Sequence, residues 1–396
     1  MTTASAGRPS NAATRPNRGD EPDLTKKPQA NAATGATAAG MRAVTAQAVA
    51  FYFRAPIKAF FRSRIDYMGY ARAINPSVQA NLGWSWRITT PALLAHAVKT
   101  HGWMFLPNQV LPPLLANTVV GAVLYTSYLQ ALSALHTPSS RSTKRIYPPP
   151  PISHTFTAGF IAGSIQSLIA APLDALQVRF RTSDMLSGKY NSMWHYASHK
   201  LHSIGLRGIF AGWTLSLLKD SLGSAIFFST FEYIKSQSYY AFITRWYGDY
   251  SPTTLHEDGK PVIKPNYALE PFFLLLAGIA ASLTQQALQH PLNELQNVHY
   301  NRLEALDLRA HDEARPRRIM RRYYHAYEKT FEQCWRLARR AGGWRRYLYR
   351  GFVMGTVRQV PSTSAGLIVF ELVRKKYAFE SDEVRIQKDG YDILLT

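Results

Sequence analysis

Six long apolar segments constrain this chain more strongly than any other feature of its sequence. A helix of about 20 apolar residues is long enough to cross a lipid bilayer, and the segments approach or reach that length. Pro56, Pro172 and Pro291 recur at nearly equal spacing and mark successive pairs of segments, which is the signature of an internal repeat. The six segments are 41–61, 110–135, 152–171, 215–234, 272–289 and 351–373.

The paired segments predict an all-α membrane protein with six transmembrane helices in three pseudo-repeats. Gly159 and Gly163 form the GxxxG spacing that lets two helix backbones approach closely in lipid. An even number of spans places both chain ends on one side and the basic loops 62–105, 179–210 and 299–349 on the other. The predicted units are a disordered tail at 1–40, repeats at 41–135, 152–236 and 268–376, and a C-terminal tail at 377–396.

The composition points to an anionic partner. The net charge is +21, which favours contact with phospholipid, nucleic acid or an anionic solute. The mean hydropathy of −0.18 is low because long polar loops dilute the apolar segments. The single cysteine, Cys334, excludes an internal disulfide and fits no multi-cysteine metal motif.

Short charged motifs occur at corresponding places in the repeats. The pattern P-x-[DE]-x-x-[KR]-x-[KR] is matched by Pro172, Asp174, Gln177 and Arg179, with glutamine in the first basic slot. An aromatic–base–glycine turn before the sixth segment consists of Tyr349, Arg350 and Gly351. The pattern [FY]-[DE]-x-x-[RK] at the end of the even segments is matched by Phe231, Glu232 and Lys235, and again by Phe370, Glu371 and Arg374.

This ordered set of motifs resembles the mitochondrial carrier family, the solute carrier family 25 type, over about residues 41–376. The resemblance implies three kinked odd helices and two charged rings that open and close a central cavity from alternate sides. Proline removes a backbone hydrogen bond, so Pro56, Pro172 and Pro291 are the expected kinks. The expected gate residues are Asp174, Gln177, Arg179, Glu232, Lys235, Gln296, Glu371 and Arg374.

The chain departs from the family pattern in both rings. Lys58 and Asn293 stand in the acid slots of the first and third repeats, so Asp174 is the only carboxylate left in that ring. The corresponding cation slots hold Phe61 and Gln296. In the other ring, the pairing that the family implies leaves Glu232 with Arg374 as the remaining bridge. The sequence therefore predicts a weak matrix-side gate and a divergent member of the family.

Two cations are expected to face the cavity. Aligning the even segments places Lys219 and Arg358 at the positions that contact solute in the family, with Asn117, Asp220 and Gln359 beside the three aligned positions. Cations in a water-filled cavity would attract an anionic or zwitterionic solute. The alternative is that Lys219 pairs only with Asp220. Buried polar side chains at Gln285, Gln286 and Gln289 are expected to line the cavity or to bond between helices.

The remaining signals favour lipid over nucleic acid. Tyr349, Arg350 and Gly351 match a cardiolipin headgroup site by resemblance, and the basic run 315–322 fits a loop beside anionic lipid. His195, His199 and His202 share one helix face, but no acid or cysteine completes a metal site there. We therefore expect no metal, no cofactor, no nucleic-acid partner and no enzyme activity, and a monomer in the membrane.

Two functions remain open at this point. The first is transport of a small-molecule solute across the mitochondrial inner membrane by alternating access. The second is a non-transporting adaptor with the carrier fold, acting in membrane organisation or fusion and located in either mitochondrial membrane. The degenerate rings favour the adaptor, whereas Lys219, Asp220, Arg358 and the intact closing motifs favour the transporter.

Overall fold

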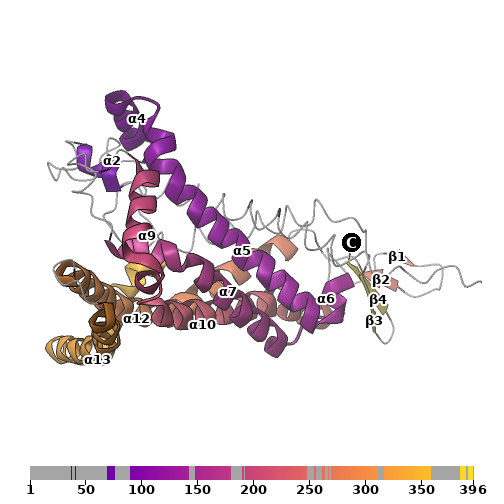
Figure 1. The fold of residues 1–396 in the computed structure, drawn as a ribbon. Coiled ribbons are helices and arrows are strands. Elements are labelled where there is room, and N and C mark those ends of the chain that lie inside the picture. Colours follow the sequence, from indigo (N-terminus) through magenta and orange to yellow (C-terminus); the bar gives the residue numbers. More distant parts are fainter. Residues whose placement is uncertain are drawn as a thin grey trace, which may run out of the picture.

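The described part of the chain is built mainly from helices that run side by side. The computed structural model describes residues 37, 41, 69–75, 90–141, 148–179, 190, 192–247, 254–255, 261–263, 266, 269–310, 316–357, 384–388 and 391–395. Four long helices form the bundle: α5 (Leu111–Leu135), α7 (Ile152–Arg179), α10 (Trp213–Glu232) and α12 (Leu269–Ala310). Helix α10 lies between α7 and α12, and α5 packs against α7 (Figure 1).

Three helical segments of the described chain are long and apolar enough to cross a membrane. They are Leu106–Leu135, Ile152–Gln177 and Leu269–Leu306, which contain the predicted second, third and fifth spans. Helix α10 contains all but the last two residues of the predicted fourth span and is more polar, with buried serines and Asp220. Its neighbours α7 and α12 cover these polar groups, which would be costly to expose to lipid. Only residue 41 of the first predicted span is described, so Pro56 lies outside the described residues. Of the sixth predicted span, residues 351–357 are described.

The prolines of the second and third repeats lie inside continuous helices. Helix α7 continues through Pro172 to Arg179, and α12 continues through Pro291 to Ala310. The fourth helix also extends beyond its predicted end at residue 234, through η3 (Tyr233–Ser238) and α11 (Tyr239–Phe242) to η4 (Ile243–Tyr247). Tyr239 and Phe242 pack on Phe273 of α12, and this apolar contact extends the helix pair.

Glycines set the distance between α7 and α10. A Cβ atom added at Gly159 would lie 2.8 Å from the carbonyl oxygen of Ser224, and one added at Gly163 would lie 2.5 Å from that of Asp220. Ser164 Oγ and Ser221 Oγ are 2.8 Å apart across the same contact. The predicted close approach at the GxxxG motif is therefore confirmed, and α10 is the partner.

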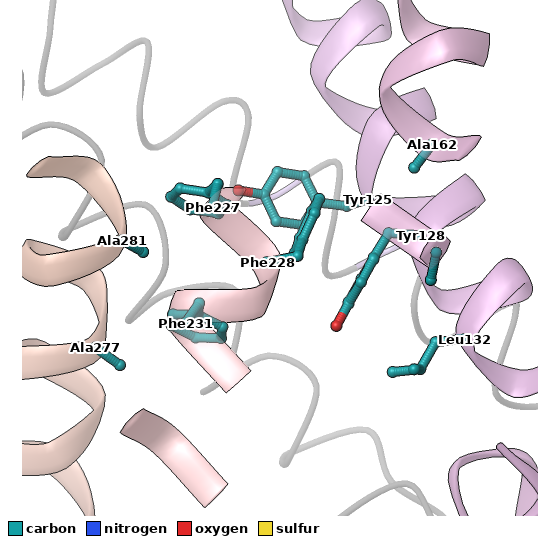
Figure 2. Close-up of a cluster of buried hydrophobic side chains, with 10 residues drawn as sticks. Tyr125, Tyr128, Leu132, Ala162, Phe227, Phe228, Phe231, Ala277 and Ala281 are labelled. Carbon is teal, nitrogen blue, oxygen red and sulfur yellow. The ribbon is translucent and has the colours of Figure 1, made fainter. Parts of the chain in front are cut away.

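Aromatic side chains fill one end of the bundle. Phe228 of α10 stacks on Tyr128 of α5, with ring centroids 3.7 Å apart, and meets Tyr125 edge-on at 5.3 Å (Figure 2). Phe227 and Phe231 continue the cluster toward the small residues of α12. Aromatic pairs of this kind add stability beyond the area they bury.

A basic helical hairpin lies at the other end. Helix α12 has 42 residues and is therefore roughly 60 Å long, about twice the thickness of a bilayer core. Its C-terminal part packs against α13 (Pro316–Arg340), followed by α14 (Trp344–Leu348). The loop predicted at 299–349 is thus largely helical. Helix α9 (Met193–Ile209) lies near the same end, and α2 (Gly69–Ile74), α4 (Thr90–His101), η2 (Leu106–Val110) and α6 (Thr137–Arg141) complete the described helices (Figure 1).

A small sheet adds to the predicted all-α architecture. Strands β1 (Thr254–Leu255) and β2 (Pro261–Ile263) pair antiparallel, as do β3 (Val384–Lys388) and β4 (Tyr391–Leu395). Strand β2 pairs parallel with β4, which gives the order β1-β2-β4-β3. The sheet lies near the end of the bundle opposite α13, so the C-terminal strands and the basic hairpin lie at opposite ends (Figure 1).

The contact at Gly163 can be tested by adding one methyl group. We expect Gly163→Ala to destabilise the protein by about 1–3 kcal/mol, because the added Cβ meets backbone that cannot rotate away. Thermal melting in detergent measures the change. Gly355→Ala is the matched control, because a Cβ there meets nothing within 4 Å. Equal melting temperatures for the two variants would contradict the contact.

Cys334 reports on the packing of α13. The thiol is fully buried, with the Tyr347 hydroxyl of α14 4.0 Å from its sulfur, and burial raises its pKa above the ordinary value. Since the thiolate is the reactive form, maleimide should label the folded protein at least about tenfold more slowly than the unfolded protein at neutral pH. Mass spectrometry over time measures the rate, and it is unambiguous because the chain has one cysteine. Rapid labelling of folded protein would show that α13 does not pack as described.

Candidate functional site

A polar cavity of about 210 Å³ lies between α7, α10 and α12, with one contribution from α5. Its position follows from the glycine contact, because Gly163 of α7 lies directly against the backbone of Asp220. Hydroxyl, amide and charged groups dominate the lining. Among the described residues, the lining consists of Leu124, Gln166, Asp174, Gln177, Lys219, Asp220, Ser224, Gln285, Gln286, Gln289, Asn293, Gln296 and Tyr300.

Lys219 and Asp220 place opposite charges side by side on the cavity wall. Lys219 Nζ lies 3.8 Å from Asp220 Oδ1, and both side chains are largely buried. Lys219 Nζ also donates a hydrogen bond of 2.8 Å to Gln296 Oε1 of α12. Ionisable groups at this depth are costly in a membrane and usually serve function. Lys219 therefore pairs with Asp220, bonds to Gln296 and lines the cavity at the same time.

A hydrogen-bond network joins the second and third repeats at one end of the cavity. Gln296 Nε2 donates to Ser216 Oγ and to Tyr300 Oη, each at 2.6 Å. Ser216 Oγ in turn donates to Asp174 Oδ2 at 3.0 Å. Ser216 and Gln296 thus link the Asp174 carboxylate to α12 through hydrogen bonds. The neutral Gln296 occupies the slot where the family pattern has a cation, and it serves as both donor and acceptor.

The aromatic cluster lies at the other end of the bundle. In the first repeat, Tyr128 occupies the aromatic slot of the family pattern and Leu129 and Leu132 occupy its two charged slots. All three pack in the apolar cluster that contains Phe228 (Figure 2). Glu232 lies beyond this cluster, with Oε2 3.7 Å from Lys235 Nζ and Oε1 accepting a 2.6 Å hydrogen bond from Ser236 Oγ. The expected partner Arg374 lies outside the described residues, as does Glu371.

The structure brings five of the predicted solute-contact and gate residues together at the cavity: Asp174, Gln177, Lys219, Asp220 and Gln296. Glu232 and Lys235 are not among its lining residues and pair with each other beyond the aromatic cluster. Asn117 is also absent from the lining: it is buried in α5, and among the described residues its side-chain Nδ2 has no hydrogen-bond partner. Arg358 and Gln359 lie outside the described residues, and Arg179 is described only as the last residue of α7.

The predicted lipid motif forms a tight turn beside α12. Tyr349 Oη donates to the Ala287 carbonyl at 3.0 Å, and the ring nitrogen of His290 lies 3.1 Å from the Arg350 carbonyl. Gly351 has a φ of 75°, a conformation that glycine adopts without strain. The exposed Arg350 side chain therefore lies at the start of the helical residues 352–357.

Sequence reasoning missed Ser216 and Tyr300, which hold the network together. Neither belongs to a charged motif, and both are common residue types in helices. Their positions in the sequence are the signal that could have identified them. Ser216 lies about one helical turn before Lys219, and Tyr300 lies about one turn after Gln296. Helical spacing around a polar motif would therefore have identified them as candidates.

Tyr327 of α13 also contacts the turn of the second repeat. Its hydroxyl donates to the Ala211 carbonyl at 3.1 Å and accepts from Thr214 Oγ1 at 2.6 Å. The ring stacks on His299 of α12, with centroids 4.1 Å apart. The helical hairpin thereby ties the start of α10 to α12, the two helices that carry most of the cavity lining.

The sequence is similar to known proteins. The family model for the mitochondrial carrier protein matches residues 148–240, which contain α7, α9 and α10. The mitochondrial arginine transporter BAC2 of Arabidopsis thaliana is 24% identical over 146 residues, or 37% of this chain and 46% of that protein. Human solute carrier family 25 member 45 is 31% identical over 128 residues, or 30% of this chain and 43% of that protein.

A longer match is to the mitochondrial thiamine pyrophosphate carrier 1 of Kluyveromyces lactis, 23% identical over 281 residues, or 69% of this chain and 74% of that protein. The chain spans a little under half the length of the first two relatives. The matched repeat, the ordered motifs and the paired helices are similar to those of membrane proteins of the carrier type. Over residues 148–240 the chain matches the mitochondrial carrier family, and the relatives described above are carriers of this type.

Gln296 should be the most sensitive member of the network. We expect Gln296→Leu to destabilise the protein by about 1–3 kcal/mol, because Lys219, Ser216 and Tyr300 each lose a buried hydrogen bond. Gln130→Leu, at an exposed position of α5, is the control for the change in polarity. Melting temperature in detergent is the measurement, and an unchanged value for Gln296→Leu would mean that the network does not hold the repeats together.

Proposed function

We propose that the protein carries a small anionic or zwitterionic solute across the mitochondrial inner membrane. The observation that supports this most directly is the adjacent Lys219 and Asp220 on the wall of a polar cavity enclosed by α7, α10 and α12. A cavity of about 210 Å³ is below the range of roughly 300–1,000 Å³ that holds drug-sized ligands. It is therefore suited to a small metabolite.

The charges of the described lining favour a zwitterion over a polyanion. Within that part of the cavity, Lys219 is the only cation, whereas Asp174 and Asp220 are both carboxylates. An amino acid can place its carboxylate near Lys219 and its ammonium near Asp220. The names of the relatives include carriers of arginine and of glycine, which is consistent with this class of solute.

Transport requires that the two ends of the cavity open alternately. At one end, the network of Asp174, Ser216, Gln296 and Tyr300 would have to break. At the other, Phe228 would have to separate from Tyr128. Lys219 donates to Gln296, so a solute bound at Lys219 would lie beside the first closure. A solute that draws the Lys219 ammonium away from Gln296 would favour opening of that end.

The non-transporting adaptor remains the second candidate. The observation that favours it is the two uncharged hydrogen bonds from Gln296 to Ser216 and Tyr300, since hydrogen bonds between amides and hydroxyls are not displaced by solute charge as ion pairs are. In that case the helices would be fixed relative to one another. The outer membrane is then as suitable a location as the inner one. Anionic lipid at Arg350, with cardiolipin as the candidate, and a monomeric state are parts of both proposals.

The transporter proposal predicts that Lys219 is required for uptake. Purified protein in liposomes should accumulate at least one labelled amino acid, and Lys219→Gln should reduce uptake by about tenfold or more, because the only cation in the described lining is lost. Lys329→Gln on the exposed face of α13 is the control. Absence of uptake with amino acids, carboxylates and nucleotides, from wild-type protein that melts cooperatively, would support the adaptor instead.

A further inference from the structure

We infer that the solute is an amino acid whose side chain carries an uncharged hydrogen-bonding group, and that the glutamine-rich wall of α12 recognises that group. The α12 wall is defined here as Gln285, Gln286, Gln289 and Asn293. The inference rests on the proposed transport function and goes further, because it names the solute class and assigns specificity to a helix outside the predicted contact positions.

The cavity has two chemically different sides. Its charged groups are on α10 and α7, where Lys219, Asp220 and Asp174 lie. Helix α12 lies opposite and contributes only neutral polar groups: the four amides of the α12 wall, Gln296 and Tyr300. The spacing of the wall residues along α12 keeps them on one helix face toward α10. A bound amino acid would therefore place its charged groups toward α10 and its side chain toward α12.

The wall is held close to the charged pair. Gln289 Nε2 lies 3.4 Å from the Lys219 carbonyl oxygen, within reach of a weak hydrogen bond. Gly223, one turn further along α10, makes room for this side chain, because a Cβ added there would overlap the Gln289 amide. Gln286 is buried and Gln285 partly buried at the same level. The amide side chains and the Lys219–Asp220 pair are therefore parts of one site.

Amides discriminate among side chains by their hydrogen-bonding capacity. A primary amide offers both donors and acceptors, so it pairs well with another amide or with a hydroxyl. An apolar side chain would offer these amides no hydrogen bond, and a site built for hydrogen bonds rejects such analogues strongly. A carboxylate side chain would enter a lining that already holds Asp174 and Asp220, where like charges disfavour it.

Three solutes of nearly equal length separate these possibilities. In proteoliposomes containing the full chain, unlabelled glutamine, glutamate and methionine should be compared as competitors for uptake of labelled glutamine. We expect glutamine to compete at least about tenfold better than either of the others. Equal competition by methionine or glutamate would overturn the assignment while leaving amino-acid transport intact. Absence of uptake of glutamine, glutamate, methionine and glycine would overturn amino-acid transport itself, and with it this inference.

Variants then assign the preference to α12. Gln285→Met nearly preserves side-chain length while removing the amide, so it should reduce the preference for glutamine over methionine by about tenfold with methionine uptake retained. Gln289→Met provides a second position in case the first fails to fold. Gln130→Met, exposed on α5, should leave the preference unchanged. If both α12 variants melt normally and still prefer glutamine over methionine, the α12 wall does not recognise the side chain of the solute.

Discussion

The close contact of α7 with α10 is the constraint on which the rest of the molecule depends. Gly159 and Gly163 allow the two backbones to approach at distances that a Cβ atom would prevent. Because of that approach, the polar face of α10 is covered by protein rather than by lipid, and Asp174 comes within reach of Ser216. Polar groups at membrane depth must find partners inside the protein. The cavity is therefore a consequence of helix packing as much as of the residues that line it.

Two different kinds of interaction lie at the two ends of the cavity in the described residues. At one end, Gln296 donates hydrogen bonds to Ser216 and Tyr300, in a slot where the family pattern has a cation. At the other end, Tyr128 stacks on Phe228 (Figure 2). The first end still contains buried ions, because Asp174 accepts from Ser216 and Lys219 donates to Gln296. A neutral glutamine therefore links helices where the family pattern has an ion pair.

Several features were predictable because they depend on local sequence. The apolar segments, the GxxxG contact and the cavity positions of Lys219, Asp220 and Gln285 follow from helical spacing and from repeat alignment. Other features were not predictable in this way. Asn117 corresponds to a cavity position in the alignment, yet it is buried in α5 away from the cavity lining. The contact of Tyr327 with Ala211 joins residues far apart in the chain, and no motif marks it.

The sequence by itself determined the class of protein, because length, hydrophobicity and repeated motifs are properties of single segments. It also determined which polar residues lie within the apolar segments. Only the tertiary structure decided what those residues bind. In the sequence, Gln296 is a neutral residue in a slot where the family pattern has a cation. In the structure, packing places it between Lys219, Ser216 and Tyr300, and its amide forms a hydrogen bond with each of them. The physical reason is that a hydrogen bond depends on the distance between atoms of different helices, and only the folded arrangement sets that distance.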